Sequence, residues 1–177
     1  MQTDYAEIVT SKPVQRFLLK FYLSDVAIES LILISPFMGT LEGTRITLDS
    51  LCKKALEKQI PLYVITCPPE SEFTQKAVDT LKSYDNVEIR FNNSLHAKLY
   101  VCICKDESQS FGLLGSANLT RSSIENMIEI AMLIYGRGNG REILRELARW
   151  GSERLRTMST TKIVKKIKYI RRDNYGI

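Results

Sequence analysis

Short apolar runs alternate with helical patterns through the first ninety residues of this chain. Each run is rich in Leu, Ile and Val, and two of the three are bounded by Pro, as is common for buried strands. Between the runs, apolar residues recur at the spacing of one helix face. The predicted strands cover 31–35, 61–66 and 87–91, and the predicted helices cover 13–23, 46–59 and 72–83. This alternation is typical of a layered α/β domain.

The pattern changes after residue 97. Three strand-like segments, 98–105, 110–116 and 128–135, follow one another, and a polar turn joins the first two. That turn predicts an antiparallel hairpin with a short loop. A Gly-rich connector at 136–140 then leads to a last predicted helix, 141–156. We therefore predict an α/β fold with a mixed β-sheet flanked by helices on both faces.

The basic residues gather at the C-terminal end. Residues 151–177 carry eight Lys or Arg against Glu153 and Asp173, so the net charge of +5 arises from this segment. A boundary near residue 157 would separate a main domain, 1–157, from a basic tail, 158–177. A basic segment suits contact with a polyanion, although a charge run alone is more often a solvated tail. The candidate substrate-binding residues in it are Lys165, Lys166, Lys168, Arg171 and Arg172.

The cysteines do not have the spacing of a zinc site. Cys52, Cys67, Cys102 and Cys104 form no C-x-x-C pair, and the chain has one histidine. We expect reduced, buried thiols, no metal and no cofactor. No apolar run approaches the ~18 residues of a membrane helix, and the first residues lack the apolar core of a signal peptide. A cytoplasmic protein without a membrane anchor is expected.

The single histidine, His96, is followed two positions later by Lys98. In a strand, residues i and i+2 project from the same face, so an imidazole would lie beside a fixed positive charge. That environment favours a neutral, nucleophilic imidazole facing an anion. An H-x-K pair alone is a weak signal, and a partly exposed strand end would explain it equally well.

A second polar group follows at the end of the partner strand of the hairpin. Gly115 permits close backbone approach, while Ser116 and Asn118 offer a hydroxyl and an amide toward one side. Together with Lys98 they could bind the non-bridging oxygens of a phosphate. The alternative is an ordinary polar turn that caps a helix.

Glu129 lies in an otherwise apolar predicted strand, where an unpaired carboxylate would be costly. We expect it to accept a hydrogen bond from His96 and to fix the tautomer of that ring. The alternative is a carboxylate at a strand edge that faces solvent.

His96-x-Lys98, then Gly115-Ser116-x-Asn118, then an acidic residue about ten positions later, resembles the phospholipase D superfamily. The signature of that superfamily is H-x-K-x4-D-x6-G-S-x-N, and the likeness is closest to its nuclease branch, with one motif per chain. The sequence departs from the signature at Ile103, where the motif has Asp, and in a longer spacing before Gly115. Because Ile103 is seven residues after His96, it would point to the opposite face of a strand, which implies a supporting role for the missing Asp.

The resemblance implies the phospholipase D-like fold over residues 1–157 and a metal-independent hydrolysis of phosphodiesters. His96 would attack phosphorus, and water would release the phosphohistidine. A second histidine protonates the leaving group in such enzymes, and this chain has only one. Two chains would therefore share one site as a homodimer, with Lys98, Ser116 and Asn118 of both copies replacing a metal.

The basic C-terminal segment favours nucleic acid as the substrate, with DNA ahead of RNA. Three alternatives stay open at this point. The protein could be a phospholipid-hydrolysing or phosphatidyl-transferring enzyme. It could be a catalytically inactive nucleic-acid-binding module of the same fold, a reading that Ile103 favours. It could also be the catalytic subunit of a larger complex.

Overall fold

The computed structural model describes residues 2–168 and contains one nine-stranded sheet. The strands are β1 (Gln2–Thr3), β2 (Ala6–Val9), β3 (Ile28–Ile34), β4 (Leu62–Thr66), β5 (Val87–Asn92), β6 (Leu99–Cys104), β7 (Phe111–Gly115), β8 (Ala131–Tyr135) and β9 (Thr161–Lys165). The helices are α1 (Pro13–Tyr22), α2 (Leu48–Glu57), α3 (Glu72–Lys82), α4 (Arg121–Glu125) and α5 (Gly140–Arg149). A 3₁₀ turn, η1 (Glu107–Gln109), and a π-helical segment that continues α5, η2 (Trp150–Leu155), complete them.

The sheet is mixed, as predicted. Its strand order is β1-β2-β8-β7-β6-β3-β4-β5-β9. Strands β3, β4 and β5 are parallel and are linked by α2 and α3, whereas the other neighbours pair antiparallel. The predicted hairpin is β6–β7, joined by η1. Because β6 runs against β3, the start of β6 lies at the same edge of the sheet as the carboxyl ends of β3, β4 and β5.

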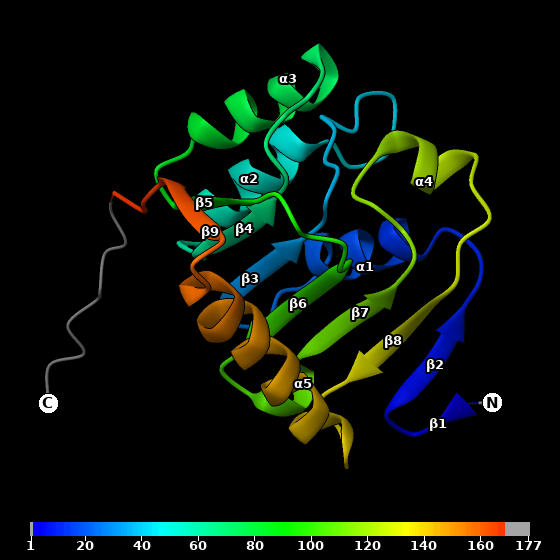
Figure 1. Ribbon diagram of the computed structural model, residues 1–177. Helices are drawn as coiled ribbons and strands as arrows, with labels where there is room; N and C mark the ends of the chain where they lie inside the picture. Colours follow the sequence, from blue (N-terminus) through cyan, green and yellow to red (C-terminus); the bar gives the residue numbers. More distant parts are fainter. Residues whose placement is uncertain (1, 169–177) are drawn as a thin grey trace, which may run out of the picture.

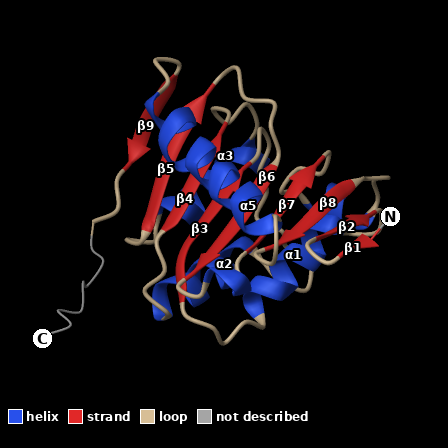
Figure 2. Cartoon of the chain, turned by 90° about the horizontal axis from the view of Figure 1, so that it is seen from below, coloured by secondary structure: helices blue, strands red, loops and turns tan. Residues whose placement is uncertain are grey.

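Helices cover both faces of the sheet, which confirms the α/β fold (Figure 1). Figure 2 shows α1 and α2 on one side and α5 on the other. The alternation of side chains along β6 explains this arrangement. Tyr100 and Cys102 belong to the core cluster that includes residues of α1, α2 and α3, whereas Leu99 and Val101 pack with Leu144 of α5.

Two predicted segments differ in the structure. The strand predicted at 128–135 begins only at Ala131, where pairing with both β2 and β7 starts. The tail predicted from residue 158 begins within the sheet, because Thr161–Lys165 forms the edge strand β9 against β5. The Thr and the β-branched pair Ile163-Val164 suit a strand, but that pairing depends on β5 having a free edge, which the sequence does not reveal.

Candidate functional site

His96 and Lys98 lie in the loop that enters β6, not within a strand as predicted. Regular pairing begins one residue later, where Leu99 lies opposite Ile34 of β3 and Leu114 of β7. The carbonyl of Lys98 nevertheless accepts a hydrogen bond from the Gly115 N–H at 3.3 Å. The H-x-K segment and the G-S-x-N segment are therefore adjacent at one edge of the sheet.

The His96 side chain is exposed, and its ring forms no hydrogen bond to any residue in the range 2–168. The ammonium of Lys98 folds back along the loop and donates to the His96 carbonyl, with 2.9 Å between Nζ and O. The charge of Lys98 is thus held next to the backbone of the histidine. An unbonded imidazole beside a fixed cation is suited to meeting an anion from solvent.

Ser116 is fixed by the segment that leads into β8. Its N–H donates to the Ile130 carbonyl at 3.0 Å, and its Oγ accepts from the Ile130 N–H at 3.1 Å. Its hydroxyl donates to the carboxylate of Glu129, a largely buried residue that lies in a loop and not in a strand. This corrects the expectation that Glu129 accepts from His96. It also means that Ser116 must turn its proton away from Glu129 before it can donate to a phosphate.

Asn118 is positioned by a residue that the sequence analysis missed, Ser35. This fully buried serine directly follows β3, and its Oγ lies 3.4 Å from Asn118 Oδ1. The same Oγ accepts from the Leu119 N–H at 3.1 Å and lies 2.8 Å from the Phe37 carbonyl. In the sequence, a serine before a proline at the end of a strand indicates only that the strand ends there. Its contact with Asn118 depends on the strand order, in which β3 and β7 are the two neighbours of β6.

Tyr100, also missed, supports the G-S-x-N segment from below. Its hydroxyl donates to the Ala117 carbonyl at 2.8 Å. Burial raises the pKa of the Tyr100 phenol well above its usual value, so the group stays a neutral donor. Phe17 of α1 packs against the ring, with 5.7 Å between the ring centroids. The backbone that carries Ser116 and Asn118 is therefore anchored to the core.

Gly115 is required by the approach of β8. A Cβ at this position would lie 2.5 Å from the Ile130 carbonyl oxygen and 2.5 Å from the Ala131 Cβ. The sequence predicts that Gly115 allows a close backbone approach. In the structure, the backbone that approaches Gly115 is that of Ile130 and Ala131, at the start of the neighbouring strand β8.

Residues 25–153, which include everything from β3 to α5, match the family described as "Cardiolipin synthase, PLD-like domain". The chain belongs to the phospholipase D-like family. No curated protein sequence matches the chain.

Solved structures share this fold. Nuc from Salmonella typhimurium, a phospholipase D family member, aligns with a TM-score of 0.60 and 13% identity, over 91% of this chain and 99% of that one. NucT from Helicobacter pylori gives 0.57 and 17%, over 90% and 98%. The phosphatidylserine synthase of Haemophilus influenzae gives 0.56 and 16%, over 94% of this chain but 40% of that one. At such identities the likeness concerns the fold.

The departure from the phospholipase D-like signature, Ile103, lies on the α5 face of the sheet. It packs at the cluster of apolar residues that contains Leu144 and lines a small cavity with Arg141 and Arg145. An aspartate at this position would act from beneath the sheet and would not touch a bound phosphate.

The basic residues proposed for substrate binding do not converge on His96. Lys165 donates to the Tyr84 carbonyl, and Lys168 Nζ lies 3.4 Å from Asp85 Oδ1. Both contacts are at the amino end of β5, opposite to the edge that carries the candidate site. Burial lowers the pKa of Lys165. Lys166 is exposed beside them, whereas Arg171 and Arg172 lie outside the described residues.

Two further features bear on the function of this phospholipase D-like chain. Among residues 2–168, no three His, Cys, Asp or Glu side chains converge as a metal site would require. In the same range, no helix has the length and apolar character needed to cross a membrane.

Proposed function

We propose that the protein is a metal-independent phosphodiesterase, an endonuclease acting on DNA or RNA, with His96 as the nucleophile. The observation that carries the proposal is the exposed, unbonded imidazole of His96 beside Lys98, at the edge where Ser116 and Asn118 follow β7. These residues would supply a nucleophile, a cation and two polar donors to one phosphate, which are the groups that phosphoryl transfer needs when no metal takes part.

The reaction would run in two displacements. A ring nitrogen of His96 forms a bond to phosphorus while the bond from phosphorus to the leaving oxygen breaks, and that oxygen takes a proton from a general acid. Water then attacks phosphorus, gives a proton to the same group, and breaks the bond between phosphorus and nitrogen. Lys98 and Asn118 would stabilise the charge on the non-bridging oxygens.

The general acid is the second histidine of a homodimer, because His96 is the one histidine of the chain. An exposed apolar face next to the site supports such a dimer. Ile8 of β2, Met132 of β8 and Leu114 of β7 lie opposite one another across three neighbouring strands, and Ile130 and Ile128 extend the row. In Figure 1, α5 crosses this side of the sheet near β6 and leaves β8 and β2 uncovered. A row of apolar side chains with no cover is typical of an interaction surface.

Nucleic acid is the favoured substrate class because the net charge of the chain is concentrated in its C-terminal segment. A backbone that runs from His96 along β5 and β9 would pass Lys166 and Lys168. Phosphatidyl transfer is the second candidate, and it is supported by the description of the matching family. A binding module without turnover is the third, and it is supported by Ile103.

The test is incubation of the purified protein with single- and double-stranded DNA and RNA in EDTA, with His96→Ala in parallel. We expect cleavage by the wild type and a loss of at least about 10³-fold in the variant, since residual catalysis without the nucleophile is small. The exposed ring of His96 makes no contact that the fold needs, so the variant should unfold at the same denaturant concentration. Headgroup release from phospholipid vesicles without DNA cleavage would favour the lipid enzyme. Binding without turnover by both proteins would favour the inactive module.

A further inference from the structure

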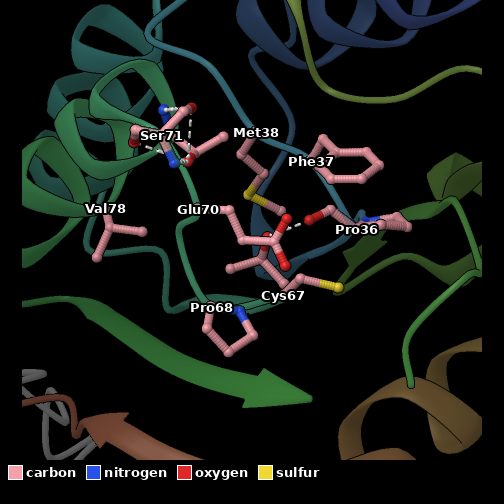
Figure 3. Close-up of a pocket in the computed structure, with 10 residues that line it drawn as sticks. Pro36, Phe37, Met38, Cys67, Pro68, Glu70, Ser71 and Val78 are labelled. Atoms are coloured by element: carbon pink, nitrogen blue, oxygen red, sulfur yellow. Dashed lines mark hydrogen bonds between the residues drawn. The ribbon is translucent and has the colours of Figure 1, made fainter. Parts of the chain in front are cut away.

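A cavity of about 270 Å³ lies beside the candidate site, where β3 and β4 end (Figure 3). Pro36 and Met38 are buried in its wall, and Val78 of α3 closes the far side. Phe37 stands at the rim with 50% of its surface exposed. The side chain of Glu70 extends across the cavity toward Cys67 (Figure 3). The space is therefore apolar, with one aromatic ring and one carboxylate.

The walls of the cavity are fixed by hydrogen bonds within them. Thr66 donates its hydroxyl to the Pro36 carbonyl at 3.1 Å, and the Cys67 N–H donates to the same carbonyl at 3.2 Å. Ser71 and Thr74 satisfy each other in a capping box at the start of α3. The cavity is thus preformed, and few polar groups in its walls remain available to form hydrogen bonds with a ligand.

Cys67 connects the cavity to the catalytic loop. Its thiol lies 3.7 Å from the carbonyl of Leu95, the residue before His96. The charge of Glu70 raises the pKa of this thiol and the charge of Lys98 lowers it, so both side chains are near enough to act on it. On the other wall, Pro36 directly follows Ser35, whose Oγ faces Asn118. A group attached to a phosphate held by Lys98 and Asn118 would therefore lie at the mouth of the cavity.

The lining excludes a phosphate and favours a neutral, planar group with hydrogen-bond donors. Among residues 2–168, no lysine, arginine or histidine lines the cavity, and Glu70 would repel an anion. The volume corresponds to about nine waters, which is close to the number of heavy atoms in a nucleobase. Phe37 offers a face on which a base can stack, and a carboxylate accepts hydrogen bonds from an amino group such as N4 of cytosine. A quaternary ammonium group would call for several aromatic rings, and Phe37 is the one aromatic residue in the lining that the described part of the chain provides.

We propose that this cavity is a nucleobase subsite, in which the base next to the scissile phosphate stacks on Phe37 and directs its amino edge to Glu70. The inference rests on the proposed nuclease function. It predicts a preference for bases that carry an exocyclic amino group over thymine and uracil, whose carbonyl oxygen would face the carboxylate.

The test compares short single-stranded oligonucleotides made of dC or of dT. Cleavage is measured with the wild type, and affinity is measured by fluorescence anisotropy with His96→Ala. We expect dC to be bound and cut about 10-fold better than dT. Phe37→Ala should weaken the binding of both by about 10-fold, and Phe37→Trp should restore it. Glu70→Gln should remove the preference for dC, because an amide can also donate to the thymine carbonyl.

The matched control is Glu72→Gln, two residues further along, where the carboxylate pairs with Lys76 at 2.9 Å outside the cavity. It should keep the preference of the wild type. Equal use of dC and dT, unchanged by either cavity substitution, would overturn the subsite and leave the nuclease in place. Absence of binding and cleavage with every oligonucleotide would overturn the nuclease itself. Headgroup release from phosphatidylethanolamine vesicles that Glu70→Gln abolishes would assign the cavity to a cationic lipid headgroup instead.

Discussion

The hydroxyl of Ser116 donates a hydrogen bond to the carboxylate of Glu129. The two residues are 13 positions apart. The segment that leads into β8 brings them together, because Ile130 bonds to Ser116 through both its N–H and its carbonyl. Glu129 therefore acts on the motif through Ser116. The orientation of the serine hydroxyl is set by an acid from the neighbouring segment.

Replacing Glu129 distinguishes positioning of Ser116 from a direct effect on His96. Glu129→Ala removes the acceptor, and we expect kcat to fall by about 10- to 100-fold, as when supporting residues of a site are lost. Glu129→Gln keeps an acceptor oxygen and should retain most of the activity if Ser116 is the partner. A loss in Glu129→Gln as large as in Glu129→Ala would instead mean that the negative charge itself is needed, as for an acid that stabilises an imidazolium. Steady-state kinetics of both variants decide between these outcomes.

The apolar row on β2, β7 and β8 predicts the response of the assembly to a charge. In Met132→Lys, an ammonium would replace a side chain at the centre of the proposed interface, where an unpaired charge is costly to desolvate. We expect a monomer in analytical ultracentrifugation and a loss of cleavage of at least 100-fold, roughly the contribution of a general acid.

Leu23→Lys is the control for that substitution, because Leu23 is an exposed apolar residue after α1, away from the row. It should stay dimeric and active. A wild-type protein that sediments as a monomer while it cleaves DNA would refute the shared site.

Much of the fold follows from local patterns, and the parts that do not follow depend on neighbours in space. The runs at 31–35, 61–66 and 87–91 correspond to β3, β4 and β5, because buried strands of β-branched and aliphatic residues leave a strong signal. Strand β9 carries Lys162 and Lys165 within five residues and resembles a tail until the free edge of β5 is known. The lysines of β9 hide its strand character in the sequence, because this strand forms through its pairing with β5.

The candidate site was predictable in its motif residues and not in their support. His96, Lys98, Ser116 and Asn118 could be named from their resemblance to the phospholipase D signature, and the structure joins the two segments through a backbone hydrogen bond between Gly115 and Lys98. Ser35 could not be named, because it contacts Asn118 across 83 positions of sequence. For the same reason the sequence predicts the wrong partner for Glu129: it predicts a strand at a position where the structure has a loop, and the carboxylate in that loop accepts from Ser116.

The position of Ile103 predicts that restoring the signature aspartate does not restore or raise activity. The side chain packs beside Leu144 on the α5 face. Ile103→Asp would lose that contact and introduce a carboxylate near Glu107, offset in part by Arg141 and Arg145. We expect the free energy of unfolding to fall by about 2 kcal/mol, measured by urea denaturation, with kcat unchanged. Ile103→Asn introduces a polar side chain of similar size without a charge, so its comparison with Ile103→Asp separates the effect of polarity from the effect of charge. A rise in kcat in the Asp variant alone would show that the carboxylate acts on the site through the sheet.

The basic segment predicts an effect that depends on substrate length. Lys166 and Lys168 follow β9 at the end of the sheet opposite to His96, so a phosphate backbone must extend several nucleotides to reach both. The double variant Lys166→Gln, Lys168→Gln should bind long DNA less tightly, with a salt dependence reduced by about one unit of slope for each lost phosphate contact. Cleavage of short oligonucleotides should be unchanged. The double variant Lys53→Gln, Lys58→Gln removes two exposed charges on α2 and at its C-terminal end, and serves as a charge-matched control. Equal losses on short and long substrates would contradict this arrangement.

Cys67 reports on the cavity through its reactivity. It is half-buried, whereas Cys52, Cys102 and Cys104 are buried, so a thiol reagent should modify Cys67 first in the folded protein. Burial and, after it, the charge of Glu70 raise the pKa of the Cys67 thiol above its usual value. Since the thiolate is the reactive form, modification near neutral pH should be slower than that of a free cysteine and should accelerate as the pH rises.

Two changes should alter the rate of Cys67 modification in opposite directions. The rate is measured by mass spectrometry of the modified peptide. Glu70→Gln removes a charge that disfavours the thiolate, so modification at a fixed pH should become faster. Saturating dC oligonucleotide added to the His96→Ala protein should slow it, because the base would cover the thiol. Modification that is insensitive to the oligonucleotide, although anisotropy shows it bound, would place the base elsewhere. The cavity beside Phe37 would then not belong to the substrate path.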